Sequence, residues 1–269
     1  MIHIFIHIFN FFLLSEFTFI DSFINIFTGG SYSLGLKEDG TVWGWGSNGS
    51  GQLGDGTIVN KKSPTLVLGN HSFINISAIV DNTLGLKADG TIWSWGYNYN
   101  GQLGDGTKIN RSSPVSVLGN HSFINISAGY DFSLGLKEDG TTWSWGNNTY
   151  GQLGNGWTNQ TSSPISVIGN HSFINISAGN NHSIGLKSDG TVWSWGYNNF
   201  GQLGDRTKTD KSSPVSVHGN HSFINVYCGP SSYNTSTIYS FSLGLKEDGT
   251  VWSWGYNYLL AQSSSPVIL

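Results

Sequence analysis

The sequence has little of several residues on which small proteins depend for stability or chemistry. It contains one cysteine, Cys228, so it forms no intrachain disulfide and no zinc site built on paired cysteines. Charged residues make up only 10% of the 269 residues, and the 12 basic ones are scattered. Nucleic-acid binding needs clustered basic residues because phosphate contacts supply most of the affinity. The sequence therefore disfavours a nucleic-acid partner.

Long apolar runs are also missing, with one exception at the N-terminus. Residues 1–14 consist almost entirely of Ile, Phe and Leu. This run is shorter than a typical membrane-spanning helix, and it lacks the basic start and the small-residue cleavage site of a secretory signal. Two interpretations stay open for residues 1–21. A signal or membrane-leaning segment would place the protein outside the cell or on its surface, and an added N-terminal strand or a start-site extension is compatible with the cytoplasm.

Glycine and tryptophan are abundant, with 37 and 11 residues, because one segment is repeated. The segment 34–46 recurs at 84–96, 134–146, 184–196 and 243–255, and the first four copies are spaced by 50 residues. The last copy follows a longer interval because of an insertion before Lys246. Similar units that need neighbours to bury their faces form a single body. Residues 22–269 are therefore predicted to form one repeat domain.

Each repeat reads as four short strands. In the copy at 120–169 we expect strands at 123–127, 133–137, 141–145 and 164–168. Asp139-Gly140 between the second and third strands predicts a hairpin with a type I′ turn. Pro164 is expected at the first position of the fourth strand, where no backbone donor is needed. Four antiparallel strands per repeat are the unit of a β-propeller blade, so the fold class is all-β. The paired tryptophans are expected to pack against glycines of a neighbouring blade.

The run W-x-W-G-x-N-x-x-G-Q-L-G-D-G at Trp93–Gly106 is similar to the signature of the regulator of chromosome condensation repeat family. The resemblance covers residues 22 to about 269, with five hairpins and four G-Q-L-G loops. It implies a β-propeller, but no single activity, since the family includes exchange factors, inhibitors, ubiquitin-ligase modules and secreted bacterial proteins. Propellers of this family commonly have seven blades. Five repeats therefore leave two alternatives, a five-bladed ring or an incomplete ring whose fifth repeat lacks G-Q-L-G.

No catalytic set, metal site or cofactor site can be singled out. A recurring histidine, at His71, His121, His171 and His221, lies on separate repeats, where metal ligands would be too far apart, so a turn and capping role is favoured. Gly44-x-Gly46-x-x-Gly49 opens no helix, so it is not a dinucleotide site. Cys228 stands where other repeats have alanine, which favours a small buried replacement over a reactive thiol. The sequence predicts that the protein is not an enzyme.

Two non-repeated surfaces are the best candidates for binding. The insertion at 230–240 is rich in Tyr, Ser and Asn, as are adaptable recognition loops, although a tolerated loop insertion is the favoured explanation. Variable loop positions carry aromatic side chains that suit contact with a protein or a glycan, unless they are buried beneath the loops. The candidate binding residues are Tyr97, Tyr99, Tyr150, Trp157, Tyr197, Phe200, Tyr233 and Tyr239.

The leading hypothesis is a non-catalytic propeller scaffold that binds another protein through its loops. The resemblance also implies guanine-nucleotide exchange on a small GTPase as an alternative. Secretion would favour a third hypothesis, multivalent binding of glycans or surfaces. Contact with a membrane is expected only through residues 1–20.

Overall fold

The computed structural model describes residues 22–229, 240–256 and 262–269, and within these ranges all regular structure is β-strand. The strands form five sheets of four, and each sheet consists of strands that are consecutive in the sequence. Neighbouring strands in a sheet are antiparallel. The prediction of one four-stranded antiparallel blade for each repeat is therefore confirmed.

Each blade runs from its innermost to its outermost strand. Blade 1 has β1 (Phe23–Thr28), β2 (Tyr32–Lys37), β3 (Val42–Gly46) and β4 (Lys61–Leu66). Blade 2 has β5 (Asn75–Ile79), β6 (Asn82–Leu86), β7 (Ile92–Gly96) and β8 (Arg111–Ser116). Blade 3 has β9 (Asn125–Ala128), β10 (Phe132–Leu136), β11 (Thr142–Gly146) and β12 (Thr161–Ser166). Blade 4 has β13 (Asn175–Ala178), β14 (His182–Leu186), β15 (Val192–Gly196) and β16 (Lys211–Ser216). Blade 5 has β17 (Asn225–Cys228), β18 (Phe241–Leu245), β19 (Val251–Gly255) and β20 (Ser263–Ile268).

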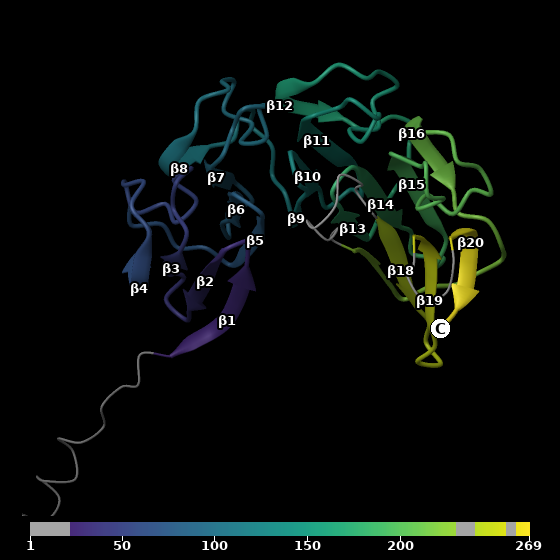
Figure 1. Ribbon diagram of the computed structural model, residues 1–269, viewed down its shortest axis with the longest axis horizontal. Coiled ribbons are helices and arrows are strands. Elements are labelled where there is room, and N and C mark those ends of the chain that lie inside the picture. Colours follow the sequence, from purple (N-terminus) through teal and green to yellow (C-terminus); the bar gives the residue numbers. More distant parts are fainter. Residues whose placement is uncertain (1–21, 230–239, 257–261) are drawn as a thin grey trace, which may run out of the picture.

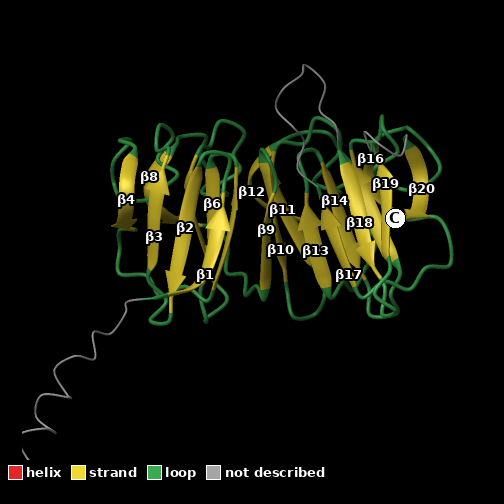
Figure 2. Ribbon diagram, turned by 60° about the horizontal axis from the view of Figure 1, so that its bottom comes forward, coloured by secondary structure: helices red, strands yellow, loops and turns green. Residues whose placement is uncertain are grey.

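The blades stand side by side in an open arc around a common axis (Figure 1). Blades 1 and 5 form the two ends of the arc, so the described blades do not close a five-bladed ring. The long loops after β3, β7, β11 and β15 lie at one end of the strands, which we call the loop face (Figure 2). The hairpin turns between the second and third strands of each blade lie at the opposite end, the hairpin face. Each blade also has an upstream side, toward the preceding repeat, and a downstream side.

The outermost strand differs from its prediction. In blade 3 it begins at Thr161 rather than at Pro164, so the proline lies inside β12. The strand is tolerant of proline because it is an edge strand with hydrogen-bond partners on one side only. Its pairing with β11 also shifts between Ser144 and Gly146, where a bulge interrupts the ladder.

The hairpin turn also differs from its prediction. A type I′ turn needs positive φ at both central residues, but only Gly140 has positive φ, at 80°. The Gly140 amide donates to the Lys137 carbonyl at 3.0 Å, and the Lys137 amide donates to the Thr141 carbonyl at 2.9 Å. This is a three-residue loop in which a tight turn is followed by a left-handed glycine. Asp139 favours it because its carboxylate accepts from the amide and the hydroxyl of Thr141.

The hydrophobic core lies between blades. At the junction of blades 2 and 3, Leu84 and Leu86 from blade 2 meet Phe123, Ile126 and Trp145 from blade 3. The same pattern recurs at the other junctions. An aromatic ring buried in this way removes about 150–250 Å² from water. Because each blade has one such face on each side, no blade buries its core alone.

Tryptophan and glycine do meet across each junction, as predicted, but the glycine lies in the G-Q-L-G loop. A Cβ added at Gly104 would come within 2.8 Å of the Trp145 indole, so only glycine allows the ring to lie there. The indole Nε1 of Trp145 donates to the Gln102 carbonyl at 2.9 Å. The strand glycine Gly135 instead makes room for Phe123 of its own blade. The motif therefore joins consecutive blades.

Candidate functional site: the aromatic loop face

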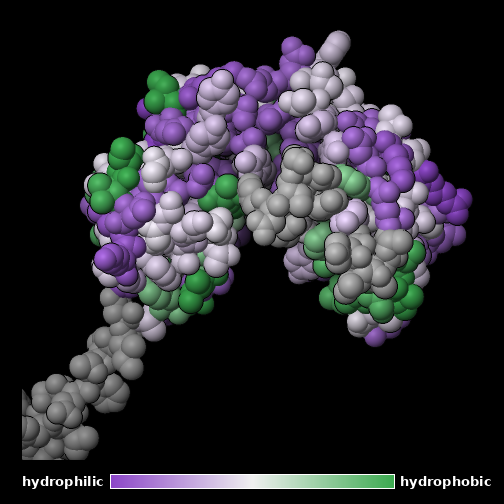
Figure 3. Space-filling view, viewed as in Figure 1, coloured by the Kyte–Doolittle hydropathy of each residue, from purple (hydrophilic) through white to green (hydrophobic). Residues whose placement is uncertain are grey.

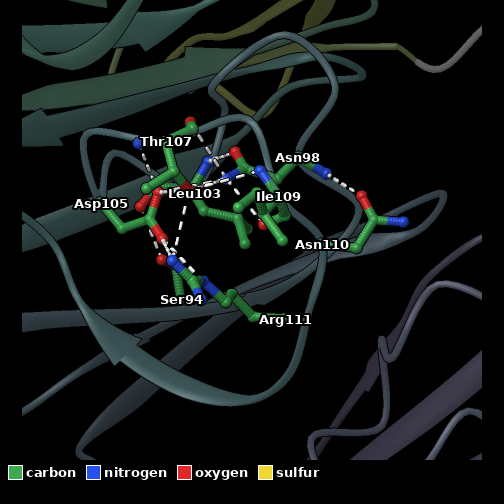
Figure 4. A network of polar contacts seen from close by, with 8 residues as sticks. All are labelled: Ser94, Asn98, Leu103, Asp105, Thr107, Ile109, Asn110 and Arg111. Carbon is green, nitrogen blue, oxygen red and sulfur yellow. Dashed lines mark hydrogen bonds and ion pairs between the residues drawn. The ribbon is translucent and has the colours of Figure 1, made fainter.

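The long loops of the loop face are held in shape by one buried asparagine each. In blade 2, the Asn98 side chain is fully buried, and its Nδ2 donates to Asp105 Oδ1 at 3.1 Å and to the Ile109 carbonyl at 3.1 Å (Figure 4). Its Oδ1 accepts from the Leu103 amide at 3.0 Å. Asn48, Asn148 and Asn198 hold the other loops in the same way. A loop fixed at its centre presents its tip residues in a constant position.

An ion pair closes the base of three loops. Arg111 meets Asp105 at 2.7 Å, and Lys61 and Lys211 meet the equivalent aspartates. Burial alone would raise the pKa of Asp105, but hydrogen bonds from Thr107 and Arg111 outweigh it and lower that pKa. In blade 3 both partners are neutral, since Asn155 replaces the aspartate and Thr161 replaces the base. The two changes occur together, which avoids an unpaired charge within a half-buried loop.

The predicted aromatic residues fall into two classes on the loop face. Tyr99 and Trp157 project into solvent, with 70% and 72% of their surface exposed. The other described candidates are half-buried, and each meets another aromatic ring: Tyr97, Tyr150, Tyr197 and Phe200. Tyr97 stacks on Tyr99 with ring centroids 6.5 Å apart. Trp157 also has a structural role, because its backbone carbonyl accepts a hydrogen bond from Asn148 Nδ2 at 2.9 Å while its ring is exposed to solvent.

A continuous aromatic band runs across blades 3, 4 and 5. Tyr150 meets Tyr197 with ring centroids 4.7 Å apart, and Tyr197 meets Phe200 at 6.1 Å. Phe200 then meets Tyr256 at 5.5 Å. Sequence reasoning missed Tyr256, although it occupies the same repeat position as Tyr97 and Tyr197 and this periodicity would have revealed it. Two further candidates, Tyr233 and Tyr239, lie outside the described residues.

A half-buried acid lies beside this surface. Asp131 accepts from Gln102 Nε2 at 3.3 Å, and burial raises its pKa to about 6 even though Asn100 and Asn147 also hydrogen-bond to it. Its charge, after burial itself, helps to raise the pKa of Tyr97. Sequence reasoning did not select Asp131. In the next blade the equivalent position is occupied by Asn181, so of these two residues only Asp131 can carry a charge.

The recurring histidines pack on tryptophan. The His121 ring lies 4.0 Å from the Trp143 ring, between centroids, and Lys137 Nζ lies 4.5 Å from the centroid of the same indole. His71, His171 and His221 make the equivalent contact. Burial and the nearby lysine lower the pKa of His121. Within the described ranges no group of three His, Cys, Asp or Glu side chains is placed to hold a metal ion.

A hollow of about 410 Å³ lies on the axis at the loop-face ends of the innermost strands. It is lined by small residues from all five blades, including Thr28, Ala78, Ala128, Ala178 and Cys228. Cys228 Sγ donates to the Ser177 carbonyl at 3.2 Å, and burial raises the pKa of the thiol. A raised thiol pKa disfavours the thiolate, which is the nucleophilic form. The described residues include no helix long and apolar enough to cross a membrane.

Consecutive four-stranded blades around one axis, joined by W-x-W tryptophans on G-Q-L-G glycines, define a β-propeller repeat protein. More particularly, the chain belongs to the RCC1-like domain family, whose model matches residues 13–262. This confirms the family that the repeat motif predicted. No curated protein sequence matches the chain.

Solved structures show the same fold. Human WBSCR16 has 24% identity and a TM-score of 0.81, over 93% of this chain and 67% of that chain. Yeast RCC1 (Prp20), solved with Kap60, has 22% identity and a TM-score of 0.73, over 92% and 63%. The ectodomain of the Arabidopsis thaliana receptor kinase ACR4 has 18% identity and a TM-score of 0.56, over 90% and 69%. The chain thus spans about two thirds of each of these relatives.

Proposed function

We propose that this protein is a non-catalytic binding module that captures another protein on its loop face. The observation that carries the proposal is the aromatic surface formed by Tyr99, Trp157 and the band from Tyr150 to Tyr256. Large aromatic side chains give much contact area at a small entropic cost, and they dominate the energetics of protein interfaces.

The rigidity of the loops supports the proposal. Binding is weakened when loops must be ordered on contact, so loops that are already fixed lose less affinity. Asn98 and its equivalents fix the centre of each loop, while the tips differ between repeats. Constant frames with variable tips suit recognition of one particular partner.

A protein partner also agrees with what is known of one relative. The structure of Prp20p from Saccharomyces cerevisiae was described together with its binding to Gsp1p and histones; it has 23% identity to this chain and a TM-score of 0.72. That likeness supports a protein partner in general. Nucleotide exchange on a small GTPase and binding of glycans remain alternative hypotheses.

The test is site-specific photocrosslinking in lysate of the source cells. A photoreactive phenylalanine replaces Tyr99 in one variant and Ile74 in the other. Ile74 is the matched control, because it is 57% exposed but lies next to the hairpin face, where its amide bonds the Leu86 carbonyl. We expect one defined protein adduct from position 99, lost when Trp157→Ala and Tyr197→Ala are added, and none from position 74.

Equal crosslinking from both positions, or none from position 99, would contradict the proposal. Two further assays separate the alternatives. Accelerated nucleotide release from a small GTPase would favour exchange, and retention on a glycan array that depends on Tyr99 would favour glycan binding.

A further inference from the structure

Blade 1 exposes, on its upstream side, residues that are buried at every internal junction. Ile26 is 59% exposed, whereas the equivalent residues of the other blades are 1–5% exposed: Ile76, Ile126, Ile176 and Val226. Phe23 and Trp45 are half-buried, while their equivalents are almost fully buried. Hydrophobic surface is visible over this end of the arc in the space-filling view (Figure 3). The upstream side of blade 1 is thus an intact copy of a junction surface.

The polar half of the junction is present on blade 1 as well. Between blades 2 and 3, the Trp145 indole and the Ser133 hydroxyl both donate to the Gln102 carbonyl, at 2.9 and 2.8 Å. The Ala128 amide donates to Ser77 Oγ at 2.9 Å. In blade 1, Trp45 and Ser33 occupy the positions of Trp145 and Ser133. No described residue accepts a hydrogen bond from either side chain.

The other end of the arc does not supply the matching acceptors. The fifth repeat has no G-Q-L-G sequence, and Tyr227, which is 52% exposed, replaces the accepting serine. The four G-Q-L-G loops of the chain already hold Trp95, Trp145, Trp195 and Trp254. None of these four loops is therefore free to accept blade 1 of a second copy. Residues 1–21, which precede blade 1, contain neither W-x-W nor G-Q-L-G.

We propose that the upstream side of blade 1 docks a separate polypeptide of the same repeat type, whose last blade presents an unoccupied G-Q-L-G loop. The glutamine carbonyl of that loop accepts from Trp45 and Ser33, its second glycine lies under the Trp45 indole, and its blade covers Ile26 and Phe23. The glycine–indole contact already occurs at all four internal junctions, and the indole-to-carbonyl bond occurs at three of them. The proposal is independent of the loop-face function.

A variant of the full chain provides the probe. In this donor, residues 257–262 are replaced by a copy of residues 198–210, Tyr227→Ser restores the accepting hydroxyl, and Trp45→Ala blocks the donor's own upstream side. The donor is mixed with the native chain, and association is followed by sedimentation velocity. We expect a 1:1 complex whose Kd is at least tenfold lower than that measured with a Trp45→Ala native chain.

The matched control is a donor that carries only Trp45→Ala and keeps the native fifth repeat; we expect no complex with it. Absence of a complex with a folded donor would overturn the proposal. Self-association of the native chain that depends on Trp45 would overturn the choice of partner, because the occupant would then be a second copy.

A second variant keeps the proposal testable if the donor does not fold. A copy of residues 73–122 is inserted between Ser22 and Phe23, which places a G-Q-L-G blade directly before blade 1 in register. We expect Trp45→Phe to lower Tm by about 5 °C in this extended chain and by less than about 2 °C in the native chain, because only the extended chain buries the indole. Equal shifts in the two chains would show that the added blade does not dock.

Discussion

His182 is a buried, uncharged histidine at the junction of blades 4 and 5, and we expect its replacement by phenylalanine to protect the protein from acid. Its ring is fully buried, and Nε2 lies 3.0 Å from Ser242 Oγ. The Ser242 hydroxyl donates its proton to the Gln202 carbonyl at 2.8 Å, so in the bond between His182 and Ser242 the donor is Nε2 of His182. Nδ1 has no partner in the described structure. A second proton would therefore place a charge in an apolar junction.

The size of the effect follows from the pKa. Burial lowers the pKa of His182 from 6.5 to about 3. Between these values the unfolded chain binds a proton that the folded chain does not, so stability is present above pH 6.5 and is lost as the pH falls. At pH 5 the unfolded state gains about 2 kcal/mol, which corresponds to roughly 1.5 pH units at 1.36 kcal/mol each. This figure is the same for any folded pKa below 4.

Phenylalanine is the matched substitution because Phe132 and Phe241 occupy the equivalent position in blades 3 and 5. The assay is urea unfolding of the native and His182→Phe chains at pH 7.5 and pH 5. Loss of the hydrogen bond to Ser242 lowers the free energy of unfolding by about 1 kcal/mol at both pH values, so it cancels in the comparison. We expect the difference in the free energy of unfolding between the two chains to change by about 2 kcal/mol from pH 7.5 to pH 5 in favour of the variant. A change below about 0.5 kcal/mol would refute the reasoning.

Three further predictions concern the loops and junctions. Asp131→Asn, which copies Asn181, should raise Tm at pH 8 and leave it unchanged at pH 4, because the raised pKa of about 6 makes the ionised carboxylate costly only at high pH; a gain that persists at pH 4 would contradict this. Trp95→Phe should cost about 2 kcal/mol in urea unfolding and Trp45→Phe less than about 1 kcal/mol, because only Trp95 is fully buried and bonded to the Gln52 carbonyl; equal costs would mean that the indole bond adds nothing. In blade 3, Asn155→Asp alone should destabilise the protein by about 1 kcal/mol, and Thr161→Lys added to it should restore stability as Arg111 does for Asp105; no rescue in thermal unfolding would count against the ion-pair account.

The repeat made the fold predictable, because period, hairpin and G-Q-L-G each recur with few changes. Local details were less predictable where context overrides the residue. Asp139-Gly140 is compatible with two hairpin loops, and the choice depends on the bond between the Lys137 amide and the Thr141 carbonyl. Pro164 marks an edge strand, but its position inside that strand depends on the bulge opposite Ser144.

The candidate site was predicted in part. The described aromatic candidates lie in loops of the loop face, where Tyr99 and Trp157 are exposed and Tyr150, Tyr197 and Phe200 form a row of ring contacts. Whether they bind a partner stays a prediction. The role of Asn98 and the raised pKa of Asp131 could not be predicted, because both depend on side chains that meet only after the loop has folded. The different roles of the two tryptophans in each W-x-W pair could not be predicted either. Trp143 packs on His121, while Trp145 contacts the preceding blade.

The one-way contact between blades has a consequence for biosynthesis. At the first three junctions the acceptor carbonyl precedes its indole donor by 43 residues, as Gln52 precedes Trp95. The ribosome therefore synthesises each G-Q-L-G loop before the tryptophan that packs on it. When that tryptophan emerges, the loop that it contacts has already been made. Nascent chains can add blades in sequence, each new one consolidating on a surface that has already emerged.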